Sequence, residues 1–88
     1  MASYRVILSR QAESVYRWLY QKDRKLFARI RAVLESLSVN PLQGKPLKGP
    51  LSGLLSYRVG SYRIIFRIVH RELRVHILDI GHRREIYH

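Results

Sequence analysis

The sequence predicts an α+β fold of the order βααβββ, in which a helical hairpin packs on one face of a mainly antiparallel four-stranded sheet. Two observations predict it. Between residues 10 and 39 apolar residues recur at the three- and four-residue spacing of amphipathic helices, and from residue 54 onward apolar and polar residues alternate as in strands. The 88 residues are 47% hydrophobic, which suits one small domain spanning residues 1–88.

The first half of the chain carries clear start and stop signals for its elements. Residues 4–8 alternate and are rich in Val and Ile, which predicts a strand. Ser9 and Asp23 are suitable N-caps for two successive helices, and Asn40-Pro41 ends the second one. The expected buried stripes are Ala12, Val15, Tyr16 and Leu19 on the first helix, and Leu26, Ile30, Val33, Leu34 and Leu37 on the second.

The second half is expected to form a loop followed by three strands. Residues 40–53 contain all three prolines, together with Lys45 and Lys48, and read as a loop. Strands are expected at about 54–59, 62–69 and 72–80. Gly60-Ser61 fits a two-residue type II′ hairpin turn, and His70-Arg71 is a weaker candidate for the second turn.

These two turns set a register that gathers cations on one face. Arg58 is expected opposite Arg63, Arg67 opposite Arg74, and Ile65 opposite His76. Strand alternation then puts Arg58, Arg63, Arg67, Arg74 and His76 on one face. The other face, beneath the helices, is expected to carry Tyr57, Val59, Tyr62, Ile64, Phe66, Ile68, Leu73, Val75 and Ile77.

The charge points to an anionic partner. Seventeen Lys and Arg residues face six acidic ones, a formal net charge of +11. Such a field favours phosphate backbones or an acidic protein, and arginine favours phosphate because its guanidinium group grips two oxygens. A well-solvated basic surface is the plain alternative. The absence of cysteine and of clustered histidines argues against a metal site, and we expect no cofactor, no membrane segment and a cytoplasmic location.

RNA can be cut without a metal when its 2′-hydroxyl attacks the adjacent phosphate. Arginine can stabilise the added charge but is a poor proton carrier, which leaves His82 and Tyr87 as the proton handlers near the end of the chain. Tyr87 has the alternative role of a packing anchor. Trp18 is expected to be a core or interface residue and not a platform for stacking bases.

The chain resembles the RelE/ParE superfamily of prokaryotic toxins along essentially its whole length. The resemblance is carried by Tyr4-Arg5-Val6-Ile7-Leu8-Ser9, Pro46-Leu47-Lys48-Gly49, Tyr57-Arg58-Val59, Tyr62-Arg63-Ile64-Ile65-Phe66 and Gly81-His82-Arg83-Arg84-Glu85-Ile86-Tyr87. It implies a toxin of a type II toxin–antitoxin system that cleaves mRNA in the ribosomal A site without a metal, leaving a 2′,3′-cyclic phosphate. Its expected partners are the ribosome, mRNA and an acidic RelB-like antitoxin.

By position, the resemblance implies that Arg58, Arg63 and Arg83 act on the scissile phosphate and that Tyr87 orients the substrate base. The proton chemistry of His82 is our inference from its residue type. The remaining expected RNA contacts are Lys45, Lys48, Arg67, Arg74, His76 and Arg84. Gly60 stands where some relatives have a second basic residue, so the general base stays unassigned. A ParE-like inhibitor of DNA gyrase and a non-catalytic RNA-binding protein are the alternatives.

Overall fold

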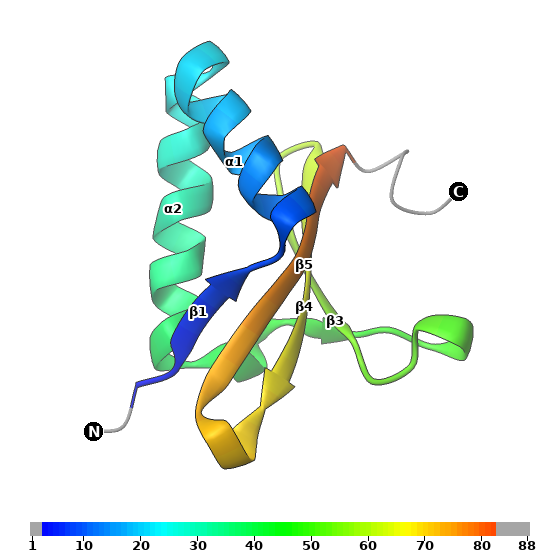
Figure 1. The fold of residues 1–88 in the computed structure, drawn as a ribbon. Coiled ribbons are helices and arrows are strands. Elements are labelled where there is room, and N and C mark those ends of the chain that lie inside the picture. The colour runs from blue at the N-terminus through cyan, green and yellow to red at the C-terminus, as the bar shows by residue number, and fades with distance from the viewer. Residues whose placement is uncertain (1–2, 83–88) are drawn as a thin grey trace.

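Two helices lie against one face of a mixed sheet in the computed structural model, which describes residues 3–82. The elements in chain order are β1 (Arg5–Leu8), α1 (Arg10–Lys22), α2 (Arg24–Val39), β2 (Lys45–Pro46), β3 (Leu55–Val59), β4 (Tyr62–Val69) and β5 (Arg74–His82). Short 3-10 helices occupy Pro41–Gln43, Gly49–Leu51 and His70–Glu72. In Figure 1 the Gly49–Leu51 turn projects away from the two helices.

The α+β class and the helical hairpin are confirmed, but the sheet has five strands and not four. Its order is β1-β5-β4-β3-β2, with β1 parallel to β5 and the other pairs antiparallel. The additional strand is β2, in which Lys45 pairs with Ser56 and Pro46 with Leu55. Two residues, one of them proline, carry no alternation by which a strand is recognised in a sequence.

The helix boundaries follow the expected capping residues. The Ser9 hydroxyl accepts the backbone N–H of Ala12 at 3.1 Å, and an Asp23 carboxylate oxygen accepts that of Leu26 at 3.1 Å. Each bond satisfies a donor that the first helical turn leaves without an intrahelical partner. The second helix ends at Val39, with Asn40 as its C-cap.

The β3–β4 hairpin has the predicted register, with Arg58 opposite Arg63 and Val59 opposite Tyr62. Gly60 has φ 61°, the left-handed conformation that the turn requires. The β4–β5 register was wrong by two residues, because the connection is the 3-10 turn His70–Glu72 and not a two-residue loop.

In the observed register Arg67 lies opposite His76, whereas Arg74 lies opposite Val69. A shift of two residues preserves the faces, so the predicted cations still share one face. Leu73 is the exception. It takes a left-handed conformation at φ 53° and is 41% exposed, so its assignment to the buried face was wrong.

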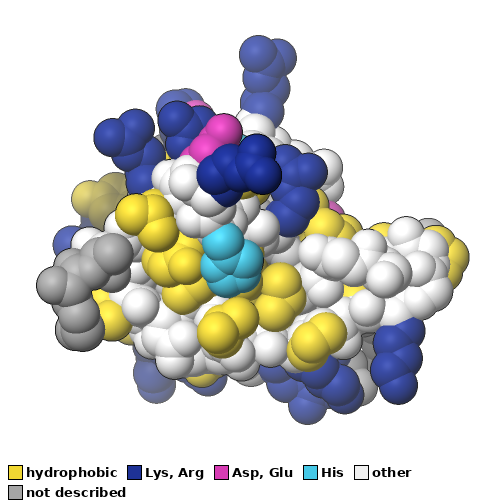
Figure 2. All heavy atoms as spheres, turned by 90° about the horizontal axis from the view of Figure 1, so that it is seen from below, with side chains coloured by type: hydrophobic (Ala, Val, Ile, Leu, Met, Phe, Trp, Pro, Cys, Tyr) yellow, Lys and Arg dark blue, Asp and Glu magenta, His cyan; other side chains and the backbone are white. Residues whose placement is uncertain are grey.

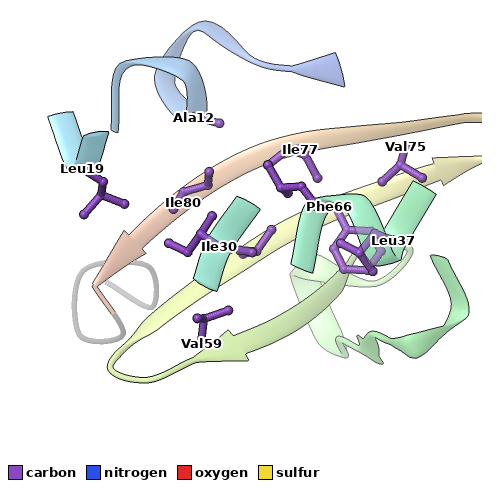
Figure 3. Packing of buried hydrophobic residues seen from close by; sticks show 11 residues of the cluster. Ala12, Leu19, Ile30, Leu37, Val59, Phe66, Val75, Ile77 and Ile80 are labelled. Carbon is purple, nitrogen blue, oxygen red and sulfur yellow. The ribbon is translucent and has the colours of Figure 1, made fainter. Parts of the chain in front are cut away.

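The core lies between the helices and the sheet (Figure 3). Ile30 and Leu37 of α2 and Phe66 of β4 are fully buried in it. Ile77 and Ile80 of β5 are also fully buried, although a regular strand would turn residues three apart to opposite faces. They share a face because the register shifts near Ile65/Phe66, which leaves Leu78 of β5 as an extra residue, as in a β-bulge.

In the part of the chain from residue 3 to residue 82, neither helix is long and apolar enough to cross a membrane.

Candidate nucleic-acid interface

A cationic hollow of about 370 Å³ lies on the sheet face opposite the helices, and we call it the arginine hollow. It is lined by Lys45, Leu47, Ser56, Arg58 and Arg63. Arg58 and Arg63 face each other across β3 and β4, and Lys45 of β2 lies opposite Ser56 of β3. Three of the predicted residues therefore meet at one place.

The two arginines of the arginine hollow differ in their burial. Arg58 is exposed, whereas Arg63 is half-buried, with a fully buried Nε atom. Arg63 lies opposite Gly81 of β5, which has no side chain to cover it. Among the described residues no carboxylate lines the hollow, and three of its five lining side chains are cationic. Guanidinium groups that converge in this way favour a phosphate group.

A second group of predicted residues continues the same face toward the β4–β5 turn. Arg67 is exposed and lies opposite the half-buried His76. Arg74 lies opposite Arg5 of β1 in the sheet register. Its charge is partly neutralised, because a Glu72 carboxylate oxygen lies 3.9 Å from its guanidinium group.

Lys48 is exposed and precedes the projecting Gly49–Leu51 turn. Lys and Arg side chains line opposite margins of the molecule in the end-on view of Figure 2. The expected cations thus form the arginine hollow and a more dispersed extension of it.

His82 does not lie in the arginine hollow. It pairs with Tyr62, and the two rings meet edge to face with their centroids 5.9 Å apart. Tyr62 packs against the core beneath the helices, so His82 is on the helix side of the sheet. With Trp18 of α1 these residues line a separate hollow of about 250 Å³, which we call the aromatic hollow.

Trp18 is not a core residue, because 53% of it is exposed, and that part of the expectation was wrong. It lies four residues after Ser14, so the two share a helix face beside the buried stripe of α1, and this position next to the stripe could be read from the sequence. The aromatic hollow itself depends on contact with β4 and β5, which no local pattern shows.

Three predicted site residues, Arg83, Arg84 and Tyr87, lie outside the described residues. Within residues 3–82, no three His, Asp or Glu side chains come together in a group that could hold a metal ion.

Comparisons with known proteins agree on one family. The sequence model of the family described as the ParE toxin of type II toxin–antitoxin systems, parDE, matches residues 6–87. The chain is 42% identical over 65 residues to Toxin RelG of Mycobacterium tuberculosis, covering 73% of this chain and 75% of that protein. It is 35% identical over 65 residues to Toxin YoeB of a Synechocystis species, covering 68% and 76% respectively.

A solved structure shows the same fold. The match is to the crystal structure of the toxin–antitoxin complex RelBE2 from Mycobacterium tuberculosis, with a TM-score of 0.77 and 34% identity over 92% of this chain and 99% of the matched one. The family model, the two relatives and the matched fold thus agree, and the chain belongs to the RelE/ParE superfamily as a toxin of a type II toxin–antitoxin system.

Proposed function

We propose that this toxin is a ribosome-dependent endoribonuclease that cleaves mRNA in the A site without a metal and so inhibits translation. The observation that carries the proposal is the arginine hollow, where Lys45, Arg58 and Arg63 converge and no described carboxylate lines the walls. Its cations suit a phosphate that gains negative charge during reaction. The similarity to RelG and YoeB toxins supports the same reading.

The proposed reaction is an attack of the 2′-oxygen on the adjacent phosphorus. The new bond closes a 2′,3′-cyclic phosphate, and the bond to the 5′-oxygen of the next nucleotide breaks. Arg63, fixed in the sheet opposite Gly81, and Arg58 stabilise the charge on the non-bridging oxygens. Arg83 adds to this stabilisation, and Tyr87 orients the substrate base.

Two proton transfers complete the reaction, one from the 2′-hydroxyl and one to the departing 5′-oxygen. Arginine stays protonated at physiological pH, so it is unsuited to either transfer. We assign proton handling to His82 and Tyr87. His82 reaches an RNA strand only where that strand passes the end of β5, because the arginine hollow is on the other side of the sheet. His82→Gln should therefore alter the pH profile of cleavage more than RNA affinity.

An open site of this kind holds a flexible strand poorly. Arg58 is exposed, and the arginine hollow opens on the side of the sheet away from the helices. Ordering of the mRNA by the ribosome supplies the in-line geometry that the protein alone leaves unfixed. The site of action is accordingly the cytoplasm. The proposed antitoxin is an acidic, RelB-like protein that covers the arginine hollow and its extension toward Arg67.

The test is primer-extension mapping of an mRNA in a reconstituted translation reaction. We expect cuts confined to A-site codons and no cuts in free mRNA. Arg63→Ala should abolish them, whereas Arg17→Ala should not, because Arg17 is an exposed α1 residue paired with Glu13 at 2.9 Å. Cleavage by a folded Arg63→Ala protein at the wild-type rate would contradict the site assignment.

Inhibition of DNA gyrase is the second candidate, and the match to the ParE family model favours it. A gyrase supercoiling assay separates the two. Loss of supercoiling with intact mRNA in the translation reaction supports the gyrase target, and the reverse pattern supports the nuclease.

A further inference from the structure

Apart from His82, the residues that line the aromatic hollow have no part in the phosphate chemistry proposed above. Trp18 is 53% exposed, although it is the largest apolar side chain of the protein. Tyr62 and His82 form a further wall, with their ring planes at 76° to each other. Tyr62 is held against the core by its packing, so this wall is fixed in place. Exposed aromatic area beside a concave surface is typical of a binding site.

The lining of the aromatic hollow differs in charge from that of the arginine hollow. Its other described members are Ser14, Val15, Ile80 and Gly81, so its lining includes neither a carboxylate nor a Lys or Arg side chain. It offers aromatic faces together with a hydroxyl group and a histidine ring. A flat, uncharged group with polar edges matches this lining, and a phosphate does not.

The two hollows lie on opposite faces of the sheet, and Arg63 of the arginine hollow is the neighbour on β4 of the end of β5 that lines the aromatic hollow. Gly81 lines the aromatic hollow, and it is also the residue directly opposite Arg63 of the arginine hollow. The pairing of β1 with β5 ends where Leu8 meets Ile77. In the described part of the chain, β5 beyond Ile77 is therefore an edge of the sheet, where Ser9 and Gln11 at the start of α1 bond to Leu78 and Asp79. The inference below takes a single strand round the end of this edge, past Gly81 and His82, from one hollow to the other.

We propose that the aromatic hollow binds one unstacked nucleobase of the RNA whose phosphate lies in the arginine hollow, with Trp18 as the stacking residue. The inference rests on the proposed function, because it requires RNA at the arginine hollow. Trp18 is a positioning residue, since it holds a base that neighbours the reacting phosphate. Stacking accepts any base, while Ser14 and His82 contact the base edge and bias the choice.

Trp18 is the only tryptophan of the chain, so its fluorescence reports on this site alone. The probe is a single-stranded RNA hexanucleotide with 2′-O-methyl groups, which blocks attack by the 2′-oxygen. The matched probe is an abasic hexamer with the same backbone. Both are titrated against the whole protein, with binding followed by the anisotropy of a dye on the probe and, separately, by Trp18 emission with unlabelled probe.

We expect saturable quenching of Trp18 by the RNA, whereas the abasic hexamer binds without quenching. Trp18→Ala should weaken RNA binding about 5- to 150-fold, the range that corresponds to loss of one base stack. It should leave abasic binding unchanged, and Trp18→Phe should retain most of the RNA affinity. The control is Tyr20→Ala, because Tyr20 is 47% exposed on the same helix but contacts Phe27 and Arg24. Circular dichroism confirms that each variant is folded.

The outcomes separate this inference from the function on which it rests. RNA that binds without quenching, or with equal affinity to wild type and Trp18→Ala, overturns the base site and leaves the nuclease proposal standing. An RNA that gives no change of anisotropy also overturns the base site, whereas the nuclease proposal, which relies on the ribosome to order the mRNA, fails only if the translation reaction gives no A-site cuts. A Trp18→Ala protein that binds its antitoxin more weakly but binds RNA normally makes the aromatic hollow a protein contact, which also overturns the inference.

Discussion

The approach of Gly44 to Phe66 allows a substitution to be worked through from the structure. A Cβ atom added at Gly44 would lie 2.8 Å from Cε1 of Phe66, closer still to Cζ, and 3.1 Å from Cβ of Leu55. Favourable carbon contacts lie at about 3.5–4.0 Å, so in Gly44→Ala the ring must move by roughly 1 Å. Phe66 is fully buried, and any movement of its ring displaces other core residues.

The expected loss of unfolding free energy in Gly44→Ala is the cost of overpacking the core, reduced by the stabilisation that comes from restricting the unfolded chain. Overpacking a core costs about 1–3 kcal/mol. Gly44 has φ −73° and ψ 161°, which alanine adopts without strain, so the substitution recovers about 0.4–1 kcal/mol by restricting the unfolded state. The free energy of unfolding should therefore fall by about 1–2 kcal/mol, which lowers Tm by roughly 5–15 °C in a domain of this size.

Urea unfolding followed by circular dichroism measures this change, with an unchanged m-value as the sign of an intact two-state transition. Phe66→Leu removes the ring atoms that clash, so a double-mutant cycle with Gly44→Ala should give a favourable coupling energy. Gly44 also precedes Lys45, so displacement of β2 should weaken RNA binding at the arginine hollow. A Gly44→Ala protein as stable as wild type, with no coupling to Phe66→Leu, would refute the reasoning.

Three other predictions concern the scaffold. Ser9→Ala should lower the free energy of unfolding by about 1–2 kcal/mol in urea titrations, because the hydroxyl caps α1 and donates to the Leu78 carbonyl at 2.8 Å. Ser9→Thr keeps a hydroxyl group and should retain most of the wild-type stability. Gly60→Ala should cost about 1 kcal/mol by the same measurement, since φ 61° disfavours a side chain, and an unchanged urea midpoint would contradict this. Burial raises the pKa of Tyr16, so the stability that its neutral form contributes is present below pH 10 and is lost as the pH rises through the raised value. Above pH 10 the free energy of unfolding should therefore fall less steeply with pH in Tyr16→Phe than in the wild type. Parallel curves for the two proteins in that range would exclude Tyr16 as the origin.

The parts of the fold that were predictable depend on local signals. Ser9, Asp23 and Asn40 mark the ends of the helices, and Gly60 specifies its hairpin, so these features and the pairing of Arg58 with Arg63 followed from short stretches of sequence. That pairing alone places two of the proposed catalytic residues together.

The parts that were missed are fixed by tertiary contacts. A left-handed leucine at Leu73 closes the β4–β5 turn, although local preference favours glycine or asparagine there. The extra residue Leu78 shows no signal of its own in the sequence. The aromatic hollow forms only because α1 lies beside the ends of β4 and β5. The sequence could therefore suggest that Trp18 is an interface residue, but it could not predict which residues surround it.

Leu78 has a consequence for changes in chain length. Because it has no opposite residue on β4, deleting it would give β5 an uninterrupted alternation with the same number of paired positions. Each later residue would then keep its partner on β4, and Ile80 would stay in the core. Deleting Asp79 would have the same effect on the register, because Leu78 would take its place opposite Ile65, but the Gln11 side chain would lose the carboxylate to which it donates. The step between Ile77 and Ile80 is therefore a place in this strand where natural or designed chains can lose one residue while both hollows keep their linings.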